Sequence, residues 1–185
     1  MTTATLPALT AGTWVIDTVH STVGFSVRHL MVSKVRGTFD EFSGTITVAE
    51  DGTPPAVEAE ISVDSINTKN EQRDGHIKSA DFFDVEKFPK ATFKSTAVRS
   101  KGSDFVLAGD FTLHGVTREV ELNLEFNGVN PGMGQGPPVA GFEATTVINR
   151  KDFDISIEMP PLEGGGAVVG DKITITLEIE AGLQA

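Results

Sequence analysis

Apolar and polar residues alternate with a period of two along most of this chain, which is the pattern of β-strands with one buried face. The first clear example is "TVGFSV" (22–27), where every second residue is apolar. The same alternation recurs in "VEAEISV" (57–63), "DFVLAGDFTL" (104–113), "VTREVELNLEF" (116–126), "GFEATTVI" (141–148) and "KITITLEI" (172–179). Segments near 35–48 and 91–99 bring the predicted strands to eight. Eight one-faced strands that close on themselves predict an all-β antiparallel barrel, filled by side chains or by one small ligand.

Turn sequences separate these strands, and one segment is predicted to be helical. Hairpin connections are expected at "EDGTPP" (50–55), "SKGSD" (100–104) and "HG" (114–115). Two longer connections, 127–138 and 158–170, are rich in Gly and Pro, and loops of that size are commonly functional or mobile. Within 35–48, Phe39 is out of step with Phe42 and Ile46, which predicts a β-bulge.

A charged stretch, "NTKNEQRDGHIKSADFFDVEKFP" (67–89), interrupts the alternation after the third predicted strand. We expect a short helix from 70 to about 80, capped by Asn67 or Thr68. If successive strands alternate in direction, the helix shares one rim of the barrel with the 158–170 loop, its expected movable neighbour. The helix would then cover the open end of the barrel with inward-facing Ile77, Phe82 and Phe83.

The same sorting places most of the 15 basic residues at this rim, together with a similar number of acids. The rest of the chain then carries the whole net charge of −11. An anionic or polar head group would be repelled least at the near-neutral rim. Loops are commonly charged, however, and that alone would produce the same distribution.

Length and charge restrict the class of protein. The 185 residues fit one domain, which we expect to comprise a flexible tail (1–12) and a barrel (13–185). The net charge of −11 argues against binding to nucleic acid and to anionic membrane surfaces. The N-terminal residues resemble no signal peptide and no apolar run reaches 18 residues, so a cytoplasmic location without a transmembrane segment is expected.

Reactive side chains give little indication of catalysis. The chain has no cysteine and no G-x-S-x-G, H-E-x-x-H or P-loop motif. His20 and His29 are an odd number of residues apart, so an unbroken strand sends them to opposite faces. His76 with Asp81 and Asp84 matches a metal site only loosely. We therefore expect no catalytic residue and no metal ligand.

The predicted interior is rich in Phe: the chain has 12 Phe, one Trp and no Tyr. An interior without Tyr suits a hydrocarbon better than a sugar or nucleotide, which needs several polar partners. In the simpler interpretation, the Phe side chains fill the barrel and leave no room for a ligand.

Four segments, in order, resemble the YceI-like family over about residues 13 to 180. They are "WVIDTVHSTVGFSVRHLMVSKVRGTFDEFSGTI" (14–46), "INTKNEQRDGHIKSADFFDVEKFPKATFKS" (66–95), "GDFTLHGVTREVEL" (109–122) and "INRKDFDIS" (148–156). The resemblance implies a lipocalin-like, eight-stranded antiparallel barrel with a helix after the third strand. It also implies a polyisoprenoid, isoprenoid quinone or other long amphiphile as ligand, no required cofactor, and a homodimer as one possible assembly. Asp154 departs from the family pattern, which usually has glycine at this position.

Our first hypothesis is a carrier that sequesters a hydrophobic small molecule of isoprenoid type inside the barrel. Strand parity predicts the residues that line the path of the tail: Val23, Phe25, Val27, Ile61, Phe93, Phe111, Phe142 and Ile175. The residues expected near the head group and the helical lid are His29, Arg73, His76, Phe82, Phe83, Asn149 and Arg150.

Two alternatives remain open at this stage. The first is an enzyme that acts on a small substrate at the same rim, using His76 with Arg73 and Asp74, or His29 with Arg28. The second is a stress-linked interaction protein with a filled barrel and an acidic working surface. An interior void distinguishes the carrier from the last of these.

Overall fold

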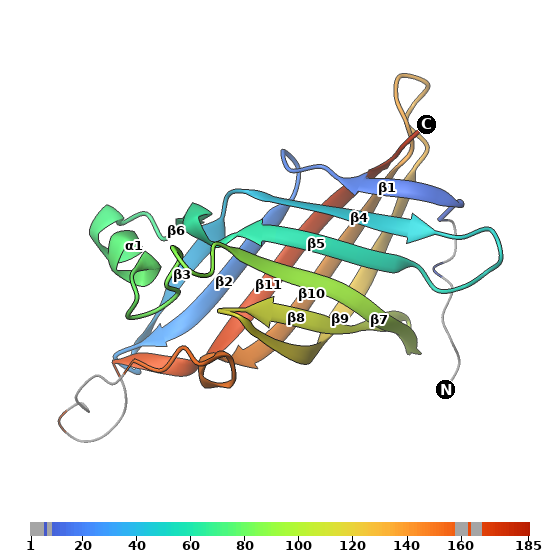
Figure 1. Ribbon diagram of the computed structural model, residues 1–185. Helices are drawn as coiled ribbons and strands as arrows, with labels where there is room; N and C mark the ends of the chain where they lie inside the picture. The colour runs from blue at the N-terminus through green and yellow to red at the C-terminus, as the bar shows by residue number, and fades with distance from the viewer. Residues whose placement is uncertain (1–5, 7–8, 158–162, 164–167) are drawn as a thin grey trace.

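The structure, a computed structural model, describes residues 6, 9–157, 163 and 168–185 and consists mainly of β-strands (Figure 1). The strands are β1 (Gly12–Ile16), β2 (Thr22–His29), β3 (Ser33–Phe39), β4 (Phe42–Val48), β5 (Ala56–Ser62), β6 (Ile66–Asn67), β7 (Lys90–Lys101), β8 (Asp104–Leu113), β9 (Val116–Asn130), β10 (Val139–Asn149) and β11 (Val169–Leu183). The described helices are α1 (Glu71–Lys78) and the 3-10 turns η1 (Val63–Ser65) and η2 (Arg150–Phe153). Among the described segments, no helix combines the length and apolar character of a transmembrane span.

Eight antiparallel strands close into a barrel, which confirms the predicted fold class. They pair in the order β1-β4-β5-β7-β8-β9-β10-β11, and β11 pairs in turn with β1 through Trp14↔Leu183 and Ile16↔Ala181. β2 continues along β11, and β3 and β6 follow β2 at that side of the sheet. The barrel therefore has no free edge where β1 meets β11.

The predicted bulge between Phe39 and Phe42 is a larger irregularity, a break that separates β3 from β4 at residues 40 and 41. β3 pairs with β2 and β6, whereas β4 pairs with β1 and β5. The break resets the alternation, so both phenylalanines line the interior although they are an odd number of residues apart.

α1 follows β6, at the predicted place in the chain, but its predicted cap was wrong. Asn70 caps the helix, and its side chain accepts a hydrogen bond from the backbone N–H of Arg73. Asn67 and Thr68 are engaged elsewhere: Asn67 Oδ1 accepts from the Lys69 N–H, and the Thr68 N–H and hydroxyl donate to Asp74.

Buried apolar residues form two clusters, one toward each end of the barrel. The cluster at the end away from α1 includes Leu6, Leu9 and Trp14, and Trp14 is fully buried with its indole N–H donated to the Thr10 carbonyl. The other cluster, around Val63 and Phe153, includes contacts from Phe82 and Phe83. Most of the expected N-terminal tail (residues 1–5 and 7–8) lies outside the described residues, as does most of the 158–170 loop expected to move beside α1.

Candidate ligand-binding cavity

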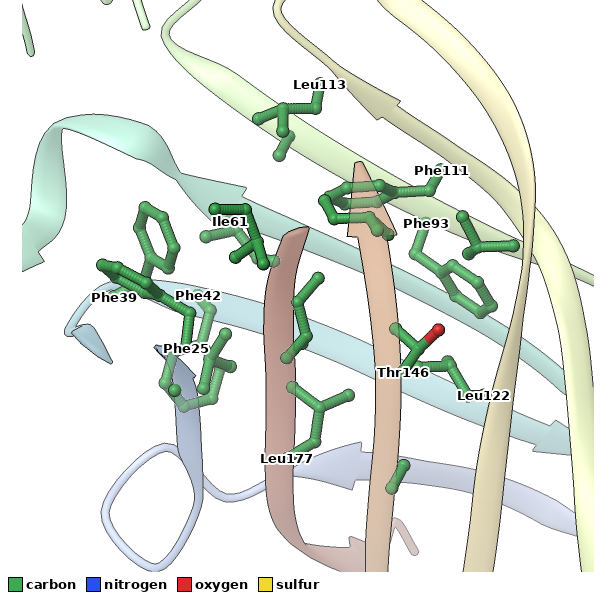
Figure 2. Close-up of a pocket in the computed structure, with 18 of the residues that line it drawn as sticks. Phe25, Phe39, Phe42, Ile61, Phe93, Phe111, Leu113, Leu122, Thr146 and Leu177 are labelled. Atoms are coloured by element: carbon green, nitrogen blue, oxygen red, sulfur yellow. The ribbon is translucent and has the colours of Figure 1, made fainter. Parts of the chain in front are cut away.

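The barrel encloses an apolar cavity of about 470 Å³. Along β11 its lining runs from Val169 to Ile179, which is roughly 33 Å of strand at about 3.3 Å per residue. Figure 2 shows side chains from several strands converging on this space, Phe25, Phe93, Phe111 and Leu177 among them. The lining includes every residue predicted for the tail path: Val23, Phe25, Val27, Ile61, Phe93, Phe111, Phe142 and Ile175. Ligand contact by these residues stays a prediction.

Two glycines provide room for the aromatic rings that shape the cavity. A Cβ at Gly37 would lie 2.6 Å from Phe25 Cζ, and a Cβ at Gly109 would lie 2.4 Å from Phe93 Cζ. Both contacts are far inside van der Waals distance. The missing side chains therefore allow each ring to lie against the neighbouring strand.

Among the residues that the structure describes, the charged side chains that line the cavity are all basic, with no Asp or Glu. The basic or potentially basic side chains are Arg28, His29, Arg73, His76 and Arg150. They lie at the ends of β2 and β10 and on α1, which is the rim predicted for the head group. Within the described part of the lining, the hydroxyl groups belong to Ser43 and Thr146. The cavity is thus a hydrocarbon-like space with basic side chains at one end.

Arg73 and Asp74 both bind Thr68 instead of forming an ion pair with each other. Arg73 Nε donates to Thr68 Oγ1 and Nη2 donates to the Thr68 carbonyl, each at 2.8 Å. Asp74 accepts from the Thr68 N–H at 3.0 Å and from its hydroxyl at 2.5 Å. Thr68 is buried, so these bonds fasten the start of the helical segment to the barrel.

Among the described residues, no hydrogen bond or ion pair joins His76 to Asp74, its partner in the enzyme hypothesis. Its Nε2 lies 3.1 Å from Asp81 Oδ2, and its ring packs edge-on against Phe82 at a centroid distance of 5.1 Å. Phe82, Phe83 and Ile77 all line the cavity, as predicted for the inner face of the lid. This part of the rim thus presents apolar side chains to the cavity, with the His76–Asp81 contact beside them.

The two predicted head-group residues from β10 differ in position. Arg150 is buried and lines the cavity, but it donates to the carbonyls of Gly170 and Ile155 and to Asp171 Oδ1. Asn149 is absent from the described lining, and its side chain accepts from the Lys151 N–H at the start of η2. η2 ends at Asp154, whose φ of 55° and ψ of 23° are left-handed, a conformation that glycine adopts more easily than other residues.

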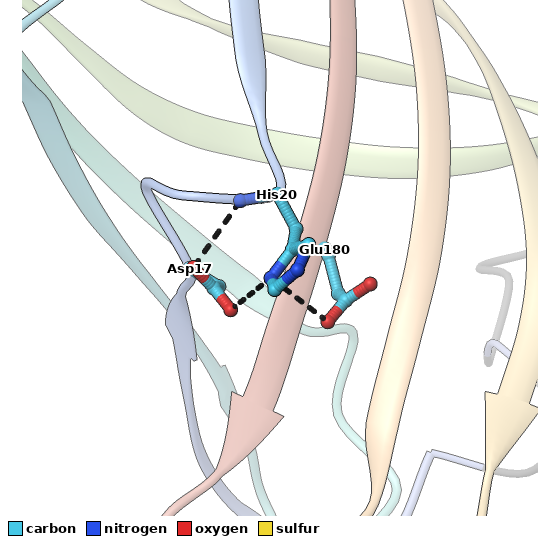
Figure 3. A group of neighbouring side chains, drawn as sticks. All are labelled: Asp17, His20 and Glu180. Atoms are coloured by element: carbon cyan, nitrogen blue, oxygen red, sulfur yellow. Dashed lines mark hydrogen bonds and ion pairs between the residues drawn. The ribbon is translucent and has the colours of Figure 1, made fainter.

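A third histidine lies in a cluster that the sequence did not predict (Figure 3). His20 Nδ1 lies 2.8 Å from Asp17 Oδ2 and 3.9 Å from Glu180 Oε1, across the break between β1 and β2. The hydrogen bond that the His20 imidazole donates to Asp17 raises the pKa of His20, and the same bond lowers the pKa of Asp17. The donor atoms are close enough for one cation to reach all three. Hydrogen bonding and charge attraction between the imidazole and the two half-exposed carboxylates account for the arrangement.

Comparison with known proteins places these features in a family. The YceI-like domain matches residues 14–181. A UPF0312 protein of Staphylococcus aureus (strain MSSA476) is 39% identical over 165 residues, covering 89% of this chain and 94% of that protein.

Solved structures give the same result for the fold. The Campylobacter jejuni YceI protein is 28% identical, with a TM-score of 0.72 over 85% of this chain and 90% of its own. A polyisoprenoid binding domain from Saccharophagus degradans, implicated in plant cell wall breakdown, is 15% identical with a TM-score of 0.71. That comparison covers 92% of this chain and 98% of the other. At this identity the likeness concerns the fold.

Proposed function

The chain belongs to the YceI-like family, and we propose that it binds and carries a long amphiphilic lipid of isoprenoid type, such as a polyprenyl lipid or an isoprenoid quinone. The observation that carries this proposal is the apolar cavity of about 470 Å³ with basic side chains at one end. Its volume falls within the range of about 300–1,000 Å³ typical of small-molecule sites.

The apolar lining supports the proposal for the tail. Transfer of a hydrocarbon from water into such a space is favourable by about 0.8 kcal/mol per CH₂, so one five-carbon isoprene unit contributes roughly 4 kcal/mol before ordering costs. A sugar or nucleotide would lose hydrogen bonds to water that Ser43 and Thr146 are too few to replace. A long unbranched or isoprenoid chain needs no such partners.

The basic rim supports a polar or anionic head group at the α1 end. Arg28 and Arg73 are exposed side chains that also line the cavity, so their guanidinium groups combine access to solvent with access to the mouth. Guanidinium groups hydrogen-bond to phosphate and to carbonyl oxygens alike. The head would then lie between β2 and α1 while the tail follows the strands toward the Trp14 end.

A filled-cavity variant tests this proposal. Thr146 points into the cavity from β10 (Figure 2), whereas its neighbour Thr145 is exposed on the outer face. We expect Thr146→Phe to occupy part of the cavity and to weaken binding of a farnesyl or geranylgeranyl lipid at least tenfold in an equilibrium titration.

Thr145→Phe is the matched control, because it adds the same ring to the outside of the same strand. It should leave the affinity unchanged within about twofold. Equal affinity for the two variants, or no saturable binding of any isoprenoid by the parent protein, would contradict the proposal.

The homodimer implied by the resemblance is the second part of this proposal. Light scattering coupled to size exclusion tests it separately, because a cavity inside one barrel is complete in a monomer.

A further inference from the structure

The turn between β2 and β3 carries three consecutive apolar residues into solvent. Leu30, Met31 and Val32 are 40%, 53% and 81% exposed. In Figure 1 the two strands meet on the side of the molecule that also carries α1. Single exposed apolar residues are normal on a folded protein, but a run of three at a hairpin tip is otherwise avoided unless it serves a function.

The backbone conformation of this tip is one that large apolar residues rarely adopt. Leu30 and Met31 both have positive φ, 49° and 60°, and the Val32 N–H donates to the His29 carbonyl at 3.2 Å. Positive φ at both central positions is the requirement of a type I′ turn, which strongly favours Asn-Gly. Large apolar side chains are disfavoured there, and unfavourable conformations concentrate at functional sites.

Basic residues flank the apolar tip. Arg28, Lys34 and Arg36 are all exposed, and no Asp or Glu occurs between Asp17 and Asp40, in a chain of net charge −11. Arg28 lies directly opposite Lys34 in the strand register, a like-charge pair that destabilises a hairpin by itself. Among the described residues none of these three cations forms an ion pair. The negative net charge therefore does not describe the electrostatics of this tip.

The tip is continuous with the mouth of the cavity. Arg28 and His29, at the end of β2, line the cavity together with Val168 and Val169, and the Leu30 N–H donates to the Val168 carbonyl at 2.9 Å. A surface that seats the tip therefore also lies beside this end of the cavity. The tip thus has apolar side chains at its end and cations behind them. This arrangement is complementary to the surface of an anionic bilayer, in which acyl chains lie beneath charged head groups.

We propose that the β2–β3 tip docks the barrel mouth onto an anionic lipid bilayer. Leu30, Met31 and Val32 enter the acyl boundary, and the three flanking cations contact lipid phosphates. Docking in this orientation brings the cavity opening to the membrane, where a lipid tail can pass between the two without crossing water. The purpose of docking rests on the proposed lipid-carrier function, but binding to the bilayer does not.

Co-sedimentation of the full chain with phosphatidylcholine vesicles, with and without phosphatidylglycerol, tests the proposal. Neither vesicle contains an isoprenoid, so the result is independent of the cargo. We expect binding to the anionic vesicles, weakened about fivefold for each flanking cation replaced, as in Lys34→Gln. Binding should also fall with added salt.

The tip variant Leu30→Asn with Met31→Gly removes the apolar anchor while supplying the residues a type I′ turn prefers. It should fold at least as stably as the parent protein and lose vesicle binding. Met133→Asn is the matched control, since Met133 is 85% exposed and has a φ of 47° on the far rim.

The outcomes separate clearly. Loss of binding in the tip variant with Met133→Asn unaffected supports docking by the tip. Equal binding of the two variants, no preference for anionic vesicles, or self-association of the parent protein through the tip without any vesicle binding would overturn it. If the protein binds vesicles but binds no isoprenoid, the docking proposal is supported and the proposed isoprenoid-carrier function is contradicted.

Discussion

Gly109 on β8 leaves open the position that the ring of Phe93 on β7 occupies. A Cβ at Gly109 would stand 2.4 Å from Phe93 Cζ and 2.6 Å from the Lys94 carbonyl oxygen. The ring can yield by turning further into the cavity, but the backbone oxygen cannot. The absence of one methyl group thus determines where an aromatic ring borders the cavity.

We therefore expect Gly109→Ala to lower the free energy of unfolding by about 1–3 kcal/mol, the usual cost of overpacking. Isoprenoid affinity should fall in parallel because Phe93 is displaced toward the ligand. Urea denaturation and lipid titration measure the two effects. Gly182→Ala is the control, since a Cβ at that position meets nothing within 4 Å. An unchanged stability for Gly109→Ala would show that the strands separate easily at this point.

Thr68 is the second position where a single substitution should have a large effect. Its hydroxyl donates to Asp74 and accepts from Arg73 Nε, and the residue is buried. Thr68→Val removes both hydrogen bonds of the hydroxyl, so Asp74 Oδ1 and Arg73 Nε each lose a hydrogen-bond partner. We therefore expect the free energy of unfolding to fall by about 1–3 kcal/mol. Thr176→Val, on the exposed face of β11, should change stability by less than about 0.5 kcal/mol. Similar values for both would mean that the helical segment is not fastened through Thr68.

The His20–Asp17 pair predicts a pH dependence. The pKa of His20 is raised above its ordinary value of 6.5, so its contribution to stability is complete below pH 6.5 and is lost as the pH rises through the folded pKa. The pKa of Asp17 is lowered below 3.8, so its contribution is present above 3.8 and is lost as the pH falls through the folded pKa.

The stability difference between the parent protein and Asp17→Asn should therefore be largest between pH 3.8 and 6.5. Denaturation across this range measures it, and an NMR titration of the His20 imidazole should give a lower pKa in the variant. A His20 pKa that does not change in Asp17→Asn would remove the basis of this prediction.

Asp154 ends η2 in the left-handed conformation, with a φ of 55°. Glycine adopts this conformation without the Cβ penalty, so Asp154→Gly should retain or slightly raise stability, while Asp154→Val should lower it by about 1–2 kcal/mol. Thermal unfolding of the two variants provides the comparison. A strongly destabilised glycine variant would indicate that the aspartate side chain itself holds the loop.

Strand alternation predicted the interior of this protein because the period of two applies wherever a strand is unbroken. It assigned Phe25, Phe93 and Phe111 to inward faces of their strands, and all three line the cavity. It also located the irregularity between Phe39 and Phe42, because the phase of the pattern changes there. The type of irregularity was not predicted, since it depends on which strands pair on either side of the break.

Long-range contacts were beyond the sequence pattern. The cluster of His20 with Glu180 joins residues from opposite ends of the chain, and no local spacing identifies it. The capping role of Asn70 was missed because Asn67, Thr68 and Asn70 are all good caps, and the contacts of the first two with Asp40 and Asp74 arise only in the folded protein. Asn149 was expected near the head group, but its side chain is engaged at the start of η2.

Native mass spectrometry of the protein purified without detergent tests the central claim most directly, because it asks whether the cavity holds a lipid. The account predicts a bound species that dissociates on activation and whose mass corresponds to an isoprenoid chain, retained by the parent protein and Thr145→Phe and depleted in Thr146→Phe. A protein of bare mass that also fails to take up added polyprenyl lipids and isoprenoid quinones would contradict it.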